Sequence, residues 1–185
     1  MKVRGLMGRI YFVRHGETVW NREKRIAGST DVALTEKGRE EAEERGKDLA
    51  TMGLKVDRIY SSPLSRAYDT ALIIASHLNV EVEKDERLRE QDFGYWEGVA
   101  PGDRKEDFIR DKMCFMKKYG DGESMLETAH RVYSFIDEKR KESGDILVVA
   151  HNGIARFFHA YFNEMTNEEF AHYSVPNCSV TVYEK

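Results

Sequence analysis

Two apolar runs, one near the start of the chain and one in its last quarter, are each followed within two residues by a histidine. Arg9–Val13 leads into Arg14-His15-Gly16, and Ile146–Ala150 leads into His151-Asn152-Gly153. Short apolar runs rich in β-branched and aromatic residues are typical of strands that are buried on both faces of a sheet. Because such strands need helices on both faces to cover them, these two runs favour an α/β fold.

Segments with strand and helix patterns alternate along the chain. Further strands are predicted at Val56–Tyr60, Val80–Glu83 and Cys178–Tyr183. Amphipathic spacing predicts helices at 35–52, from 62 onwards, at 103–119, from 124 to about 136, and at 153–162. Ser62 and Pro63 would begin the second helix as N-cap and first helical residue, and Ser124 with Glu127 forms a capping box. The alternation predicts a three-layer α/β/α sandwich with a mostly parallel mixed sheet, the last strand being the expected exception.

The length of 185 residues fits one domain, residues 1–185, and the charge balance excludes several classes of partner. The 29 Lys and Arg against 33 Asp and Glu give a net charge of −4, whereas nonspecific nucleic-acid binding and polybasic membrane anchors need a basic surface. No apolar run approaches the roughly 20 residues of a membrane span, and no signal-peptide cleavage site follows the first one. Cys114 and Cys178 read as reduced thiols. We therefore expect a cytoplasmic protein with no nucleic-acid or membrane partner.

Two histidines and two arginines are expected to meet at one edge of the sheet. Ligands of open α/β sheets bind beyond the carboxyl ends of the strands, where Arg14, His15 and His151 follow two strands and Arg66 follows a third. Arginines bind phosphoryl oxygens in bidentate fashion, and a neutral histidine nitrogen is a competent nucleophile. Taken singly, such histidines are more often structural and such arginines are more often solvated. The repeated pattern leaves the phosphate-site and structural interpretations about equally supported.

A glycine follows close behind each histidine. Gly16 and Gly153 would either let the backbone approach a ligand closely or take a positive φ.

Six segments, in order along the chain, resemble motifs of the histidine phosphatase (phosphoglycerate mutase-like) superfamily. They are Phe12–Asn21, Asp31–Gly38, Tyr60–Ala71, Leu88–Gly98, Gly122–Ser124 and Val148–Gly153. Each motif alone is moderately specific, and the ordered set is highly specific. The resemblance implies a phosphoglycerate mutase-like fold with a short segment at 98–122, the cap segment, over the site.

The resemblance also implies a role for each motif residue. His15 would be the nucleophile, and Arg14, Arg66 and His151 would hold the phosphoryl oxygens. Glu90 would be the general acid and then the base. The remaining substrate-binding residues implied are Asn21, Gly28 and Asn152. Neither a metal nor an organic cofactor is implied, and the partner would be a small phosphorylated metabolite.

Two residues depart from the family pattern, and three activities stay open. Asn152 stands where the family usually has glycine, and Ala27 stands where many relatives carry glutamine. Asparagine tolerates positive φ, so the turn at 152 is expected to survive.

Metal-independent hydrolysis of a phosphate monoester through phosphohistidine is the favoured activity. A phosphoglycerate mutase is the second, disfavoured because the chain stops two residues after its last strand, and an inactive phospho-ligand-binding relative is the third. The oligomeric state, monomer or homodimer, is open.

Overall fold

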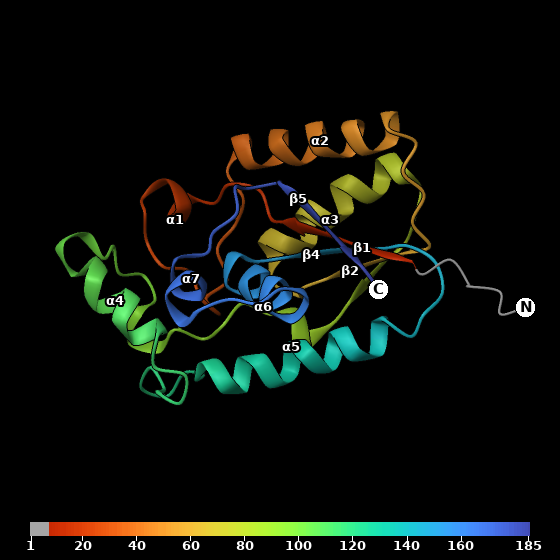
Figure 1. The fold of residues 1–185 in the computed structure, drawn as a ribbon. Helices are drawn as coiled ribbons and strands as arrows, with labels where there is room; N and C mark the ends of the chain where they lie inside the picture. Colours follow the sequence, from red (N-terminus) through yellow and green to blue (C-terminus); the bar gives the residue numbers. More distant parts are fainter. Residues whose placement is uncertain (1–7) are drawn as a thin grey trace, which may run out of the picture.

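The computed structural model describes residues 8–185, which form a five-stranded sheet between two layers of helices (Figure 1). The strands are β1 (Arg9–Arg14), β2 (Arg58–Ser61), β3 (Val82–Lys84), β4 (Ile146–Ala150) and β5 (Val180–Glu184), in the spatial order β3-β2-β4-β1-β5. All neighbours are parallel except β1 and β5, which are antiparallel. The predicted α/β/α sandwich and its antiparallel last strand are confirmed.

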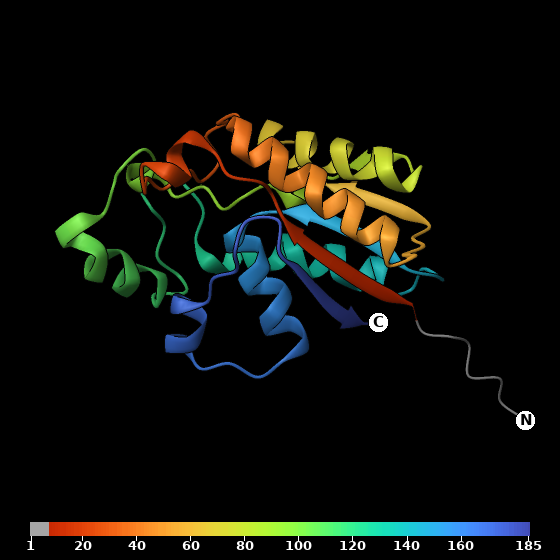
Figure 2. The same cartoon turned by 90° about the horizontal axis from the view of Figure 1, so that it is seen from above.

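Side chains that alternate along the strands divide the core into two halves. On one face, Val13, Leu147 and Val149 pack against α2 (Glu36–Thr51) and α3 (Ser65–Leu78). On the other, Phe12 and Val148 pack against α5 (Met125–Lys139) and α6 (Asn152–Phe162). Figure 2 shows the sheet between these two helix layers.

The carboxyl ends of the parallel strands point toward α1 (Val19–Arg22), α4 (Lys105–Lys112) and α7 (Asn167–His172) (Figures 1 and 2). Single-turn 3-10 helices occupy 86–88, 94–96 and 102–104. Sequence periodicity did not indicate α1 or α7, because helices of four and six residues are too short to show a repeat. Within residues 8–185, no helix is long and apolar enough to cross a membrane.

Two helix predictions need correction. The helix expected over 103–119 ends at Lys112 as α4. The helix expected to begin at Ser62 begins at Ser65, with Leu64 as an extended N-cap residue. The sheet ladder continues to Ser62, whose N–H donates to the Val149 carbonyl at 3.0 Å, so Ser62 cannot be a helix cap. Asp31 takes that part instead, because its carboxylate accepts from the Ser65 N–H at 2.9 Å.

Side-chain caps begin two further helices, and the one predicted, the capping box of α5, is confirmed. The Thr35 hydroxyl accepts from the Gly38 N–H at the start of α2. Ser124 and Glu127 form the reciprocal capping box of α5.

Candidate active site

The two strand-end histidines lie side by side at the carboxyl edge of the sheet. Arg14 is in register with Ala150, and the His15 N–H donates to the Ala150 carbonyl at 3.0 Å, so the residues that follow β1 and β4 must be neighbours. The ring centroids of His15 and His151 are 5.1 Å apart. Both rings are buried. The structure therefore brings together the histidines that the sequence pattern pairs.

Hydrogen bonding leaves one ring nitrogen of His15 with a free lone pair. Nδ1 lies 2.7 Å from the Gly16 carbonyl, which can only accept, so we assign the proton to Nδ1 and the lone pair to Nε2. Burial, with the nearby charges of Arg66 and Arg14, lowers the pKa of His15 well below its ordinary value. His15 is therefore a neutral imidazole at pH 7, with Nε2 available as a nucleophile.

Of the two predicted arginines, Arg66 is buried and Arg14 is half-buried, and both are only partly paired. Arg14 donates from Nη1 to the Val175 carbonyl at 2.5 Å. Arg66 donates from Nη1 to the Thr30 carbonyl at 2.8 Å and from Nη2 to the Gly28 carbonyl at 2.7 Å. Both guanidinium groups are thus fixed by backbone carbonyls, with no carboxylate hydrogen-bonded to them in the described part of the chain. Their positive charge is left available to an anion.

Three buried polar atoms around His15 have no hydrogen-bond partner among residues 8–185. They are Nε of Arg14, Nε of Arg66 and Nδ1 of His151. A buried unsatisfied polar group costs about 1–3 kcal/mol, and more when it is charged, so such groups usually have a ligand. Nε2 of His151 is 2.7 Å from the Ser62 hydroxyl, which aligns the ring. Two of these atoms are guanidinium nitrogens, whose N–H groups form strong hydrogen bonds with oxyanions.

Glu90 occupies the same edge from the loop between the first two 3-10 helices. One of its carboxylate oxygens accepts from the Gly153 N–H at 2.8 Å, and the other accepts from the Gln91 N–H at 3.0 Å. Its negative charge raises the pKa of Arg14 and of Arg66, opposing the larger effect of burial. A carboxyl group therefore lies within electrostatic reach of both arginines.

The chain matches the family model of the histidine phosphatase superfamily (branch 1) over residues 10–185. The chain belongs to this superfamily. It is 32% identical over 183 residues to phosphoserine phosphatase 1 of Hydrogenobacter thermophilus, covering 95% of this chain and 86% of that protein. It is 30% identical over 187 residues to the 2,3-bisphosphoglycerate-dependent phosphoglycerate mutase of Parvibaculum lavamentivorans, covering 95% and 89%. The solved structure of a mycobacterial glucosyl-3-phosphoglycerate phosphatase superposes with a TM-score of 0.80 at 26% identity, covering 95% and 89%.

Gly16 and Gly153 share one structural explanation, which is close contact with other parts of the protein. Neither has a positive φ, so that prediction is wrong. A Cβ on Gly16 would collide with the backbone of Gly38, and one on Gly153 would collide with the Glu90 carboxylate. Close approach of these glycines to a ligand stays a prediction.

Asn152 is also not in the left-handed region, contrary to expectation, because it is the first residue of α6. Its side-chain oxygen accepts from the Val175 N–H at 2.9 Å and from the Ser174 hydroxyl at 3.1 Å. Since the Val175 carbonyl accepts from Arg14, Asn152 positions the loop that orients Arg14. The departure from the family's usual glycine therefore has a local structural use.

The remaining predicted contacts lie next to the site. Asn21 is the third residue of α1 and part of its capping box, and its side-chain oxygen accepts from the Thr18 N–H at 3.1 Å. The Gly28 carbonyl binds Arg66 and its φ of 52° is in the region that favours glycine. Substrate contacts of both residues stay predictions.

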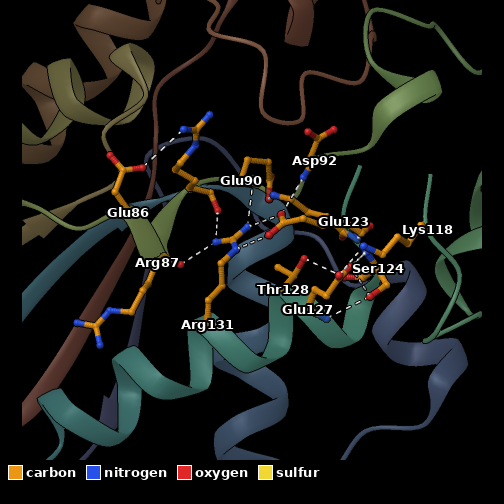
Figure 3. Close-up of polar contacts among 12 residues, drawn as sticks. Glu86, Arg87, Glu90, Asp92, Lys118, Glu123, Ser124, Glu127, Thr128 and Arg131 are labelled. Carbon is orange, nitrogen blue, oxygen red and sulfur yellow. Dashed lines mark hydrogen bonds and ion pairs between the residues drawn. The ribbon is translucent and has the colours of Figure 1, made fainter. Parts of the chain in front are cut away.

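Sequence reasoning missed residues that hold this site together. Arg131 of α5 donates to the carbonyls of Arg87 and Arg89 at 2.7 Å, and of Glu90 at 3.3 Å. It also forms a bidentate ion pair with the Glu123 carboxylate, in which its Nε and Nη2 each lie 2.8 Å from a carboxylate oxygen (Figure 3). These bonds hold the backbone that carries Glu90. The partners are 8 to 44 residues away in sequence, so no local pattern could have indicated them.

Asn177 was missed for the same reason. Its side-chain N–H donates to the His15 carbonyl at 2.7 Å, and it reaches the site from the loop before β5. Thr70 on α3 accepts from the Gly16 N–H at 3.1 Å. Asn177 and Thr70 therefore hold the loop that carries His15 and Gly16 from two sides.

The lowered histidine pKa values predict how stability depends on pH. Burial and neighbouring arginines lower the pKa of both His15 and His151 well below 6.5. Below pH 6.5 the unfolded state therefore binds more protons than the folded state, so the free energy of unfolding falls on acidification. The fall is up to about 1.4 kcal/mol per pH unit for each histidine.

Urea unfolding between pH 6.5 and 5 measures this effect. Variants His15→Asn and His151→Asn should each show a shallower pH dependence than the wild type. An unchanged slope in both variants would contradict the assignment of neutral buried histidines.

Proposed function

We propose that this chain hydrolyses phosphate monoesters of small molecules through a phosphohistidine on His15. The observation that supports the proposal is the set of buried nitrogen atoms of Arg14, Arg66 and His151 that have no partner among residues 8–185 and surround a neutral histidine. Cationic side chains there can take the role that metal ions have in other phosphoryl-transfer enzymes.

The first step transfers the phosphoryl group to the protein. Nε2 of His15 forms a bond to phosphorus while the bond from phosphorus to the ester oxygen breaks. The two arginines and His151 hold the three non-bridging oxygens, where negative charge is spread in the transition state. In its protonated form, Glu90 gives its proton to the departing alcohol oxygen, which would otherwise leave as an unstable alkoxide.

The second step regenerates the histidine. Glu90, now a carboxylate, takes a proton from water as the water oxygen bonds to phosphorus and the bond from phosphorus to Nε2 breaks. Inorganic phosphate leaves, and both His15 and Glu90 return to their starting protonation states. One carboxyl group thus serves as acid and base in turn.

A mutase is the second candidate, because the Parvibaculum relative carries that name at an identity similar to that of the phosphatase relative. The two activities differ only in what accepts the phosphoryl group, water or a phosphoglycerate. Hydrolysis is favoured because the solved relative is also named a phosphatase.

One assay tests the proposal and separates the two activities. The protein is incubated with 3-phosphoglycerate and with p-nitrophenyl phosphate, in excess EDTA, and both phosphate release and 2-phosphoglycerate are measured. We expect phosphate release from p-nitrophenyl phosphate and no 2-phosphoglycerate above background. Formation of 2-phosphoglycerate faster than phosphate release would establish the mutase, and an inert protein would support a phospho-ligand-binding role.

A further inference from the structure

A second carboxylate, Glu97, lies at the far end of the loop that carries Glu90. It follows the 3-10 helix at 94–96 as its C-cap residue, and its side chain is half-buried. The carboxylate accepts five hydrogen bonds, all of them from backbone N–H or hydroxyl groups. The proposed reaction does not use Glu97, so this number of donors on one carboxylate needs an explanation of its own.

Four of the five donors belong to two adjacent residues, Ser29 and Thr30. Oε1 of Glu97 accepts from the Ser29 N–H at 2.7 Å and from the Ser29 hydroxyl at 3.1 Å. Oε2 accepts from the Thr30 N–H at 2.9 Å and from the Thr30 hydroxyl. The fifth donor is the Phe93 N–H, 3.0 Å from Oε1. Glu97 thus fastens residues 28–30, the 28–30 loop, to the loop that carries Glu90.

The peptide unit between Gly28 and Ser29 connects Glu97 to Arg66. Its N–H, on Ser29, donates to Glu97, and its carbonyl, on Gly28, accepts from Nη2 of Arg66 at 2.7 Å. Because a peptide unit is planar and rigid, the direction of its N–H fixes the direction of its carbonyl. Glu97 therefore determines where the Gly28 carbonyl points, and that carbonyl holds one end of the Arg66 guanidinium.

The rest of the 28–30 loop is fixed in the same way. The Thr30 carbonyl accepts from Nη1 of Arg66 at 2.8 Å, while the N–H and hydroxyl of Thr30 are on Glu97. A Cβ on Gly28 would lie 2.0 Å from Oε1 of Glu97, so the loop packs directly against the carboxylate. Asp31 ties the following residue to the start of α3. The loop is therefore held between Glu97 and the helix that carries Arg66.

This arrangement stabilises the charge of Arg66 without occupying its N–H groups. An anion and a cation at opposite ends of one peptide unit polarise it in the same sense, which strengthens both hydrogen bonds. Burial lowers the pKa of Arg66, and the carboxylates of Glu90, Asp31 and Glu97 oppose that effect. A carboxylate bonded directly to the guanidinium would compete with a phosphoryl oxygen, whereas Glu97 leaves Nε of Arg66 without a partner among residues 8–185.

We propose that Glu97 is a positioning residue of the phosphate site, which acts on the phosphoryl group through the 28–30 loop and Arg66. The inference rests on the proposed phosphatase function, in which Arg66 holds a non-bridging oxygen. Charge-stabilising groups work only when they are fixed in the productive geometry before the reaction. Loss of Glu97 would leave the guanidinium in place but free to turn away from the phosphoryl group.

Binding of orthovanadate, measured by calorimetry, tests this role. Vanadate adopts the five-coordinate geometry of phosphoryl transfer and needs no turnover. Glu97→Gln should weaken its binding about 10- to 100-fold, the range of one charge-assisted hydrogen bond, because an amide nitrogen cannot accept from the N–H groups of Ser29 or Thr30. Glu169→Gln is the matched control and should leave the affinity unchanged, since the Glu169 carboxylate also accepts from one threonine, Thr166, at 2.7 and 2.9 Å.

A double-mutant cycle separates positioning from a merely structural role. In an Arg66→Met background, Glu97→Gln should weaken vanadate binding by about twofold or less, because the group through which Glu97 acts is gone. Equal losses in the two backgrounds would overturn the proposal, and so would wild-type affinity in the Glu97→Gln single variant.

Further outcomes separate this role from the function on which it rests. A wild-type protein that binds vanadate but releases no phosphate from p-nitrophenyl phosphate overturns the proposed hydrolysis alone, and one that does not bind vanadate overturns both. If circular dichroism shows that Glu97→Gln is unfolded, Thr30→Val replaces it, since it removes one hydroxyl from Glu97 and should weaken binding several-fold only where Arg66 is present. If Arg66→Met is unfolded, Arg66→Lys replaces it, because an ammonium lacks the fork that the two carbonyls hold.

Discussion

His15→Ala is expected to abolish hydrolysis of p-nitrophenyl phosphate, with kcat falling by about four orders of magnitude or more. The reason is that His15 supplies the only bond between the protein and phosphorus in the proposed intermediate. Removal of a covalent nucleophile has effects of this size. Wild-type protein that is quenched in alkali after exposure to labelled substrate should carry acid-labile phosphate. The variant should carry none.

The control for this prediction is His130→Ala. His130 is an exposed residue of α5, so its loss should leave kcat and phosphoenzyme unchanged. Full activity in His15→Ala would refute the nucleophile assignment. Loss of wild-type activity in excess EDTA would instead refute the metal-independent mechanism.

Glu90→Gln is expected to show a loss that depends on the leaving group. With alkyl phosphates, whose alkoxide needs a proton, kcat should fall by about 10²- to 10⁴-fold. With p-nitrophenyl phosphate the loss should be much smaller, because nitrophenolate leaves without a proton. Glutamine keeps the size of the side chain and removes the proton transfer, together with one of the two hydrogen bonds that Glu90 accepts from backbone N–H groups.

A plot of log kcat against leaving-group pKa, for wild type and variant, measures this effect, and the variant should show the steeper slope. Arg131→Gln should show a weaker form of the same pattern, because it frees the loop that carries Glu90 without removing the carboxyl group. Parallel slopes for wild type and Glu90→Gln would rule out Glu90 as the general acid.

Local sequence was a good guide where the responsible forces are local. The strands β1 and β4 followed from apolar runs, and the starts of α2 and α5 followed from Thr35 and Ser124. A cap is a hydrogen bond between residues three apart, so the sequence contains both partners. The start of α3 was mistaken because its cap comes from Asp31, 34 residues away.

The candidate site divides in the same way. His15, Glu90 and Arg66 lie in motifs that resemble a known family, so single segments sufficed to select them. Arg131 and Asn177 were missed because their significance depends on distant segments. Arg131 matters through carbonyls of another loop, and Asn177 through the carbonyl of His15. Neither property can be seen in the residues that flank them.

The sequence by itself determined the α/β class, the histidine phosphatase resemblance and the residues available for chemistry, since apolar periodicity and short motifs are local properties of the chain. Only the tertiary structure decided which nitrogen of His15 is free, that both histidines are neutral, and that backbone carbonyls hold Arg14 and Arg66. Those properties depend on burial and on charges from strands and helices far apart in the chain. Folding brings these groups together in a low-dielectric interior, where desolvation and neighbouring charge set their protonation.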